Sequence, residues 1–407
     1  MLNLARVLVL VGALCVIALG FLVGSLGILA SFLDPTGDRL TMVTISVSFM
    51  ALSMGLGSML AWQTWKAIQG KESRPFRPRW VWVSFLVFPL AVLAGQSVLR
   101  LDLLPPLIFP PLHVVAAVLP PLTVIALVSK TLGGTSRQRD VVFQTSSGAF
   151  LSTFLAFTLE FAFVLGLLLT IITFVVLQSG GLEQIQALAA RLQDPTWLEN
   201  PAELASMAVS PLVLASAFLV FAIVVPLIEE AVKTVGVGLM AYRRPRLSQA
   251  FLWGLAGGAG FALAEGLLNS IGGLDAWALT VSARVGATLV HCFTGALMGL
   301  AWYAVLTDRR WGRALGLYAV SVGIHGLWNA LTAGMAFISL GVLGSQATGT
   351  GQTLAEVSIA VIVAMLVSLT LAVALGLIGL TRHVRRRCLA IEASRPAPGL
   401  SPSDPVP

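Results

Sequence analysis

The segment VPLIEEAVK, residues 225–233, places three ionised side chains inside an otherwise apolar run that extends over residues 208–242. Such charges are costly at bilayer depth unless they are paired, hydrated or bound to a ligand. In a helix, Lys233 lies four residues after Glu229 and three after Glu230, so it can neutralise either carboxylate. One negative charge is left over, and the polar residues of other spans must account for it.

The composition is that of a membrane protein, because 57% of the 407 residues are hydrophobic and only 11% are charged. The polar gaps are too short to bury a core of their own, so no large soluble domain is expected. Hydropathy predicts an all-α, polytopic transmembrane helix bundle of about ten spans. The expected spans are residues 7–33, 41–63, 80–99, 103–129, 145–178, 208–242, 250–270, 280–306, 314–342 and 355–380.

The basic residues are concentrated on one side of this bundle. Most of the 25 basic residues fall in every second loop and in both chain ends. The positive-inside rule therefore places the N and C termini in the cytoplasm. The net charge of +7 is explained by topology, so the expected partner is the lipid bilayer and not a nucleic acid. We expect an integral, multi-pass protein of a bacterial plasma membrane.

Five parts are expected along the chain. They are a five-span N-terminal membrane scaffold (1–178), an external acidic loop with a short amphipathic helix (179–207), a four-span catalytic core (208–342), a last transmembrane span (343–380), and a basic and then disordered cytoplasmic tail (381–407). Two polar residues of the scaffold stand out. His113, in a proline-rich span expected to be kinked or interrupted, should bond to a free backbone carbonyl. Glu160 is a mid-membrane carboxylate and hence a candidate site residue.

The residues capable of chemistry are concentrated in the second half of the chain. Span seven carries Glu265, span eight carries Arg284 and His291, and span nine carries His325 and Asn329. Counted at 1.5 Å per residue from the cytoplasmic helix ends, these groups and Glu229 reach similar depths of roughly 18 to 24 Å, Arg284 excepted. Small-xxx-small patterns would let spans seven and eight approach closely; they are Gly254 with Gly258 and Gly295 with Gly299. We therefore predict one intramembrane site.

This set of side chains suits hydrolysis by activated water. A carboxylate in a low-dielectric site can take a proton from water, and an imidazole and an amide can face a developing oxyanion. The predicted catalytic residues are Glu229, Glu230, Glu265, His325 and Asn329, and the supporting residues are Lys233, Arg284 and His291. In an alternative mechanism, Glu265, His291 and His325 hold a zinc ion (Zn2+) and Glu229 is the base.

The motifs also carry a family resemblance. Glu229-Glu230-x-x-Lys233, Phe261-x-x-x-Glu265, Arg284 with His291, and His325-x-x-x-Asn329 follow one another on successive spans. This order resembles the PrsW family of intramembrane proteases, which is similar in motif layout to the type II CAAX prenyl endopeptidases. The resemblance covers residues 226–331. It implies that the substrate is a membrane-embedded protein or peptide, that Glu229 and Glu265 activate water, and that His325 and Asn329 stabilise the oxyanion.

Three other interpretations compete with a peptidase. The charges could be packing pairs, Glu229 with Lys233 and Glu265 with Arg284. A proton- or ion-coupled membrane transporter also uses mid-membrane glutamates and histidines, but it predicts an inverted repeat, and the first half of the chain offers only His113 and Glu160. A non-catalytic membrane scaffold would have no need to keep both Glu229 and Glu265.

Overall fold

The structure is a computed structural model that describes residues 2–33, 38–78, 81–178, 180–194, 197, 200–271, 274–345 and 349–394. Over these residues the chain is helical and contains no strand, only one isolated β-bridge between Pro75 and Arg137. Ten helical runs in the described part are long and apolar enough to cross a membrane. The predicted all-α fold with ten spans is therefore confirmed.

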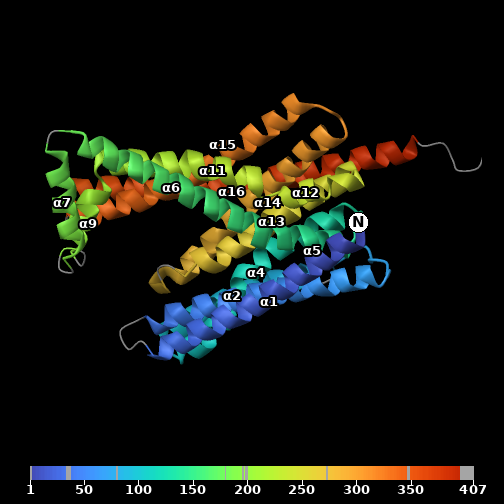
Figure 1. The fold of residues 1–407 in the computed structure, drawn as a ribbon, viewed down its shortest axis with the longest axis horizontal. Helices are drawn as coiled ribbons and strands as arrows, with labels where there is room; N and C mark the ends of the chain where they lie inside the picture. Colours follow the sequence, from blue (N-terminus) through green and yellow to red (C-terminus); the bar gives the residue numbers. More distant parts are fainter. Residues whose placement is uncertain are drawn as a thin grey trace, which may run out of the picture.

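The first half of the chain forms five spans and a short helical segment. The spans are α1 (Leu2–Leu33), α2 (Arg39–Ile68), α3 (Val81–Arg100), α4 (Pro105–Thr131) and the continuous run of α5 (Gln138–Ser146), the π-helix η1 (Ser147–Ser152) and α6 (Thr153–Val176). Two short helices follow, α7 (Gly181–Leu192) and α9 (Pro201–Ala208). Figure 1 shows both at the end of the molecule opposite the N-terminus. Leu182, Ile185 and Leu188 recur at helical spacing on α7, which agrees with the expected amphipathic helix.

The second half forms the other five spans. The sixth span combines α10 (Pro211–Phe218), the π-helix η2 (Leu219–Val224), α11 (Val225–Val232) and α12 (Val235–Leu239), and the 3-10 turn η3 (Ala241–Arg243) follows it. The remaining elements are α13 (Leu247–Asn269), the 3-10 turn η4 (Leu274–Ala276), α14 (Trp277–Leu306), α15 (Trp311–Ser345) and α16 (Thr350–Ala393).

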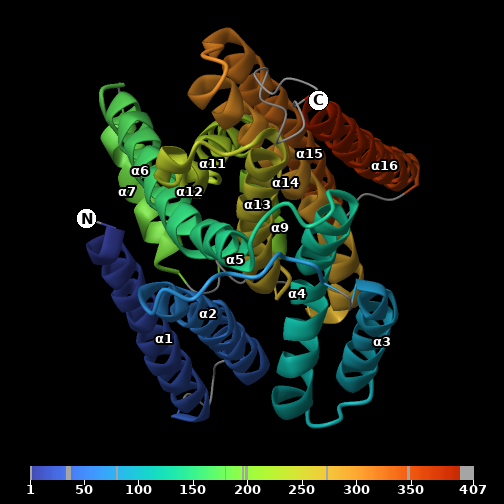
Figure 2. The same ribbon diagram turned by 90° about the vertical axis from the view of Figure 1, so that its right-hand side faces the viewer.

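Helix α13 lies at the centre of the bundle (Figure 2), where it packs against α4, α5, η1 and α14. Glycine makes its contact with α14 close. A Cβ on Gly258 would lie 2.1 Å from the carbonyl oxygen of His291, and one on Gly295 would lie 2.6 Å from that of Gly254. The small-residue contact predicted from the sequence is thus present, and it brings the backbones that carry Glu265 and His291 together.

The sixth span is irregular just before its two glutamates. In the π register of η2, the backbone N–H of Val225 bonds to the carbonyl of Val220, so residue 226 should donate to Phe221. Pro226 has no N–H to give. The side-chain amide of Asn329 on α15 donates to this carbonyl instead, at 3.0 Å. A Cβ on Gly326, one turn earlier, would lie 2.4 Å from the Ala222 oxygen, so glycine also permits the close approach of α15.

The proline-rich span is one uninterrupted helix, α4, although four prolines lie inside it. Of the two expected effects of these prolines, a kink or an interruption, the interruption is therefore not found. Its histidine behaves as expected, because His113 Nε2 lies 3.0 Å from the carbonyl oxygen of Leu267, in the last turn of α13, where carbonyls lack helical partners. The indole of Trp277 donates to His113 Nδ1 at 2.9 Å. His113 therefore ties α4 to α13 and α14 and has a structural role.

Candidate active site

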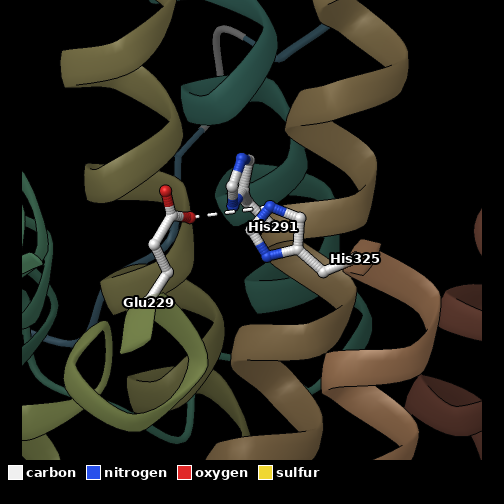
Figure 3. Close-up of side chains that lie close together, drawn as sticks. All are labelled: Glu229, His291 and His325. Carbon is white, nitrogen blue, oxygen red and sulfur yellow. Dashed lines mark ion pairs between the residues drawn. The ribbon is translucent and has the colours of Figure 1, made fainter. Parts of the chain in front are cut away.

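Polar side chains from four spans meet inside the bundle. Glu229, Glu230 and Lys233 come from the sixth span, Glu265 from α13, His291 from α14 and His325 from α15. The two imidazole rings lie edge to face with their centroids 4.8 Å apart. Figure 3 shows the carboxylate of Glu229 pointing towards them. These side chains, predicted to share one site, therefore lie together in the structure.

Glu230 is the centre of the inner part of the cluster. Its Oε1 atom lies 2.6 Å from Lys233 Nζ and 2.9 Å from His325 Nδ1, and it accepts a bond of 3.1 Å from the hydroxyl of Thr294. All four side chains are buried. Lys233 therefore pairs with the glutamate three residues before it, and Glu229 carries the surplus charge. Thr294 is a participant that the motif analysis missed, although it follows His291 by one helical turn.

Glu265 organises the outer part of the cluster. Its Oε2 atom lies 2.9 Å from Arg284 Nη2 and 2.8 Å from His291 Nε2. The side chains of Glu265 and Arg284 are 20% and 21% exposed, whereas that of His291 is only 4% exposed. The cluster therefore opens to its surroundings on the side of Glu265 and Arg284.

Glu229 is the carboxylate with the fewest partners. It is 5% exposed, and its Oε2 atom has no hydrogen-bond partner among the described residues. The imidazole nitrogen Nε2 of His325 lies 3.6 Å from it. Because the Lys233 ammonium is already bound to Glu230, the packing pair of Glu229 with Lys233 is not formed. An unpaired buried carboxylate oxygen beside an imidazole nitrogen is a position where a cation or a proton is needed.

The ligand atoms of Glu229, His291 and His325 all lie within 4.8 Å of one another, as a metal ion requires. His325 fits this use directly, because its Nδ1–H is held by Glu230 and its Nε2 is free. His291 fits after a proton shift. Lys233 Nζ now lies 2.9 Å from its Nδ1 and donates to it, so Nε2 carries the hydrogen that faces Glu265. Metal binding at Nε2 would require the ring hydrogen to move to Nδ1 and Lys233 to release one proton, so that its neutral amine accepts from Nδ1.

Two other candidates lie at the margin of the cluster. Asn329 stands one turn after His325 on α15, but its side-chain amide donates to the carbonyl of Phe221 and not to the carboxylates. Glu160 on α6 lies close enough to Glu229 and Glu265 to interact with them electrostatically. One of its carboxylate oxygens is buried without a partner among the described residues. It is therefore a fourth carboxylate near the site.

These features define a class of protein: a polytopic membrane hydrolase with a buried site of carboxylates and imidazoles that can hold a metal ion. The model of the PrsW family, described as intramembrane metalloproteases, matches residues 156–373. This is more than half of the chain, which therefore belongs to the PrsW family and is an intramembrane protease. The match begins within α6 and ends within α16, well beyond the motif region 226–331. The comparisons with curated proteins and with solved structures found no match.

Proposed function

We propose that the protein hydrolyses peptide bonds of membrane-embedded proteins at the cluster of Glu229, Glu265, His291 and His325. The observation that carries this proposal is the buried, unpartnered Glu229 Oε2 beside the free Nε2 of His325. A transporter would need a route across the membrane with a second polar cluster, and the family match gives that alternative no support.

Zinc is the metal that suits this donor set best. Imidazole nitrogens and carboxylate oxygens are its usual ligands, and catalytic zinc sites use three protein ligands and leave one position open. We propose that Glu229, His291 and His325 hold the ion, since their ligand atoms already lie together. When bound, zinc would acidify a water molecule and polarise the scissile carbonyl.

Glu265 is then the group that takes the proton from water. Of the buried cluster's carboxylates it is the one that reaches the open side, and Arg284 balances its charge at 2.9 Å. This assignment exchanges the roles of Glu229 and Glu265 relative to the zinc mechanism considered from the sequence. The exchange is made because Glu229 Oε2 has no other partner, whereas Glu265 Oε2 has two.

The other predicted residues orient these groups. Glu230 and Lys233 hold the Nδ1 atoms of His325 and His291. An imidazole that binds a metal cannot also face the oxyanion, so Asn329 is the donor we assign to that role. One N–H of its amide is used by Phe221, which fixes the side chain, and the second is the one that would face the substrate. The opening beside Glu265 and Arg284 is where a membrane-embedded peptide would enter.

Metal content and cleavage, measured on the same preparations, test this division of roles. We expect Glu229→Gln and His325→Ala to lose both zinc and cleavage of a co-expressed single-span membrane protein. Glu265→Gln should keep near-stoichiometric zinc and lose cleavage by at least ~100-fold, as expected when a general base is removed. Arg284→Gln removes the positive charge beside Glu265 and leaves the Glu265 carboxylate in place. It is therefore the matched control for the change of charge at this position.

Two results would contradict the proposal. Full zinc content in Glu229→Gln together with zinc loss in Glu265→Gln would return the ligand role to Glu265 and the base role to Glu229. Unchanged cleavage in all three variants would move catalysis away from this cluster altogether. Membrane insertion and accumulation, detected through an epitope tag, should be unaffected in each variant.

A further inference from the structure

A second polar cavity, of about 400 Å³, lies outside the catalytic cluster. Four arginines and one carboxylate line it: Arg6 near the start of α1, Arg137 and Arg139 at the start of α5, Arg243 in η3, and Asp140. These residues all stand at the ends of candidate spans. Figure 1 places the starts of α1 and α5 at the same end of the molecule, opposite α7.

The positive charge of this cavity is largely uncompensated. Asp140 is bound to Arg243, with 2.5 Å between Oδ1 and Nη1. Within the described residues, the guanidinium groups of Arg6 and Arg139 donate to backbone carbonyls, at 3.0 and 2.9 Å, and form no ion pair. Arg137 forms no ion pair among the described residues. Arg139 interacts electrostatically with the other three arginines and with Asp140. One carboxylate cannot offset four guanidinium groups, so a further anion between them would reduce their mutual repulsion.

Two buried donors of the same cavity lack acceptors. Trp253 lines the cavity and is 1% exposed, and its Nε1–H has no hydrogen-bond partner within the described residues. The Nε–H of Arg139 is likewise buried and unpartnered there. A buried N–H without an acceptor has lost its hydrogen bond to water with nothing to replace it. An anion with several oxygens in this cavity would supply acceptors as well as charge.

We propose that this cavity binds a phosphate group, carried by the headgroup of an anionic phospholipid. Guanidinium groups match the geometry of phosphate oxygens with paired N–H donors, and basic pockets at the ends of membrane helices bind phospholipid headgroups. The cavity joins α1 and α5 to η3 and α13. Bound phosphate would therefore hold the first spans of the chain against the helix that carries Glu265.

The test is a titration of the detergent-solubilised full chain, followed by thermal unfolding and native mass spectrometry. The probes are dioctanoyl phosphatidylglycerol, dioctanoyl phosphatidylcholine as the net-neutral lipid, and inorganic phosphate. Phosphatidylglycerol should raise the unfolding temperature of the wild type, and phosphatidylcholine should not. Arg137→Gln should weaken phosphatidylglycerol binding about fivefold, and Arg6→Gln with Arg137→Gln about 30-fold, at ~1 kcal/mol per arginine near a membrane surface.

The matched control is Arg385→Gln with Arg386→Gln, which removes the same charge from exposed positions near the end of α16. It should bind phosphatidylglycerol like the wild type. An equal loss of binding in this control, or equal stabilisation by phosphatidylcholine, would overturn the proposal. If inorganic phosphate alone gives the stabilisation and Arg137→Gln weakens it, the phosphate site is supported, but its ligand comes from solution and not from the membrane.

Discussion

Lys233 is the residue on which the charge balance of the active site depends. Its side chain is fully buried and makes its ion pair with Glu230. The ammonium also donates to His291 Nδ1 and lies 5.3 Å from the ring centroid of Phe261. One cation thus offsets the charge of a buried carboxylate and fixes the orientation of a predicted metal ligand. Without it, Glu229 and Glu230 would be adjacent buried anions.

We therefore expect Lys233→Met to destabilise the protein by about 3–5 kcal/mol, because removing one partner of a buried pair leaves an uncompensated charge. Adding Glu230→Gln should recover part of this loss, since the amide is neutral and its oxygen can still accept from His325. Chemical denaturation in detergent micelles measures both variants and the Glu230→Gln single variant. A double variant less stable than Lys233→Met alone would show that the pair is not the source of the effect.

The contact between α13 and α14 determines how close the catalytic side chains can come. Glycines lie along this contact on both helices, and the added Cβ atoms considered above would meet the backbone of the opposite helix. Backbone cannot move aside as a flexible side chain can, so a methyl group there must separate the helices. Glu265 and His291, 2.8 Å apart across this contact, would be separated with them.

Two alanine substitutions on the same helix test this role. Gly258→Ala should destabilise the protein by about 1–3 kcal/mol through overpacking and should reduce cleavage. Gly266→Ala, two turns later, has its nearest neighbour 3.8 Å away, so it should be neutral or stabilising by up to about 1 kcal/mol through helix propensity. Unfolding temperature and cleavage rate give the comparison. Equal effects at the two positions would mean that helix proximity is not limiting.

For the helices and the contacts between them, the sequence was sufficient to predict some features and not others. Hydropathy located the ten helices, and counting residues from their ends put the polar groups at one depth. The pairing of Lys233 could not be decided, because positions three and four residues apart are both neighbours on a helix. The bond of Asn329 to Phe221 depends on a π-helical register before Pro226, which a hydrophobic pattern does not reveal.

The arginines near the end of α16 and the acidic loop lie at opposite ends of the molecule (Figure 1). In Figure 1, the start of α1 and the end of α16 lie at one end, and α7 and α9 lie at the other. Arg385, Arg386 and Arg387 stand in the last turns of α16. The positive-inside rule predicts that the end that carries these arginines and the arginine cavity is cytoplasmic. This orientation would also bring that cavity to the inner leaflet, where anionic lipids are concentrated.

Cysteine labelling tests this orientation. Cys388 follows the three arginines and is half-buried, whereas Cys292 is fully buried and Cys15 lies within α1. In a Cys15→Ala, Cys292→Ala background, a membrane-impermeant maleimide should label Cys388 only after the cells are permeabilised. With Cys388→Ala added, Glu183→Cys on the exposed face of α7 should be labelled in intact cells. The reverse pattern would invert the topology, and the arginine cavity would then face the outer leaflet.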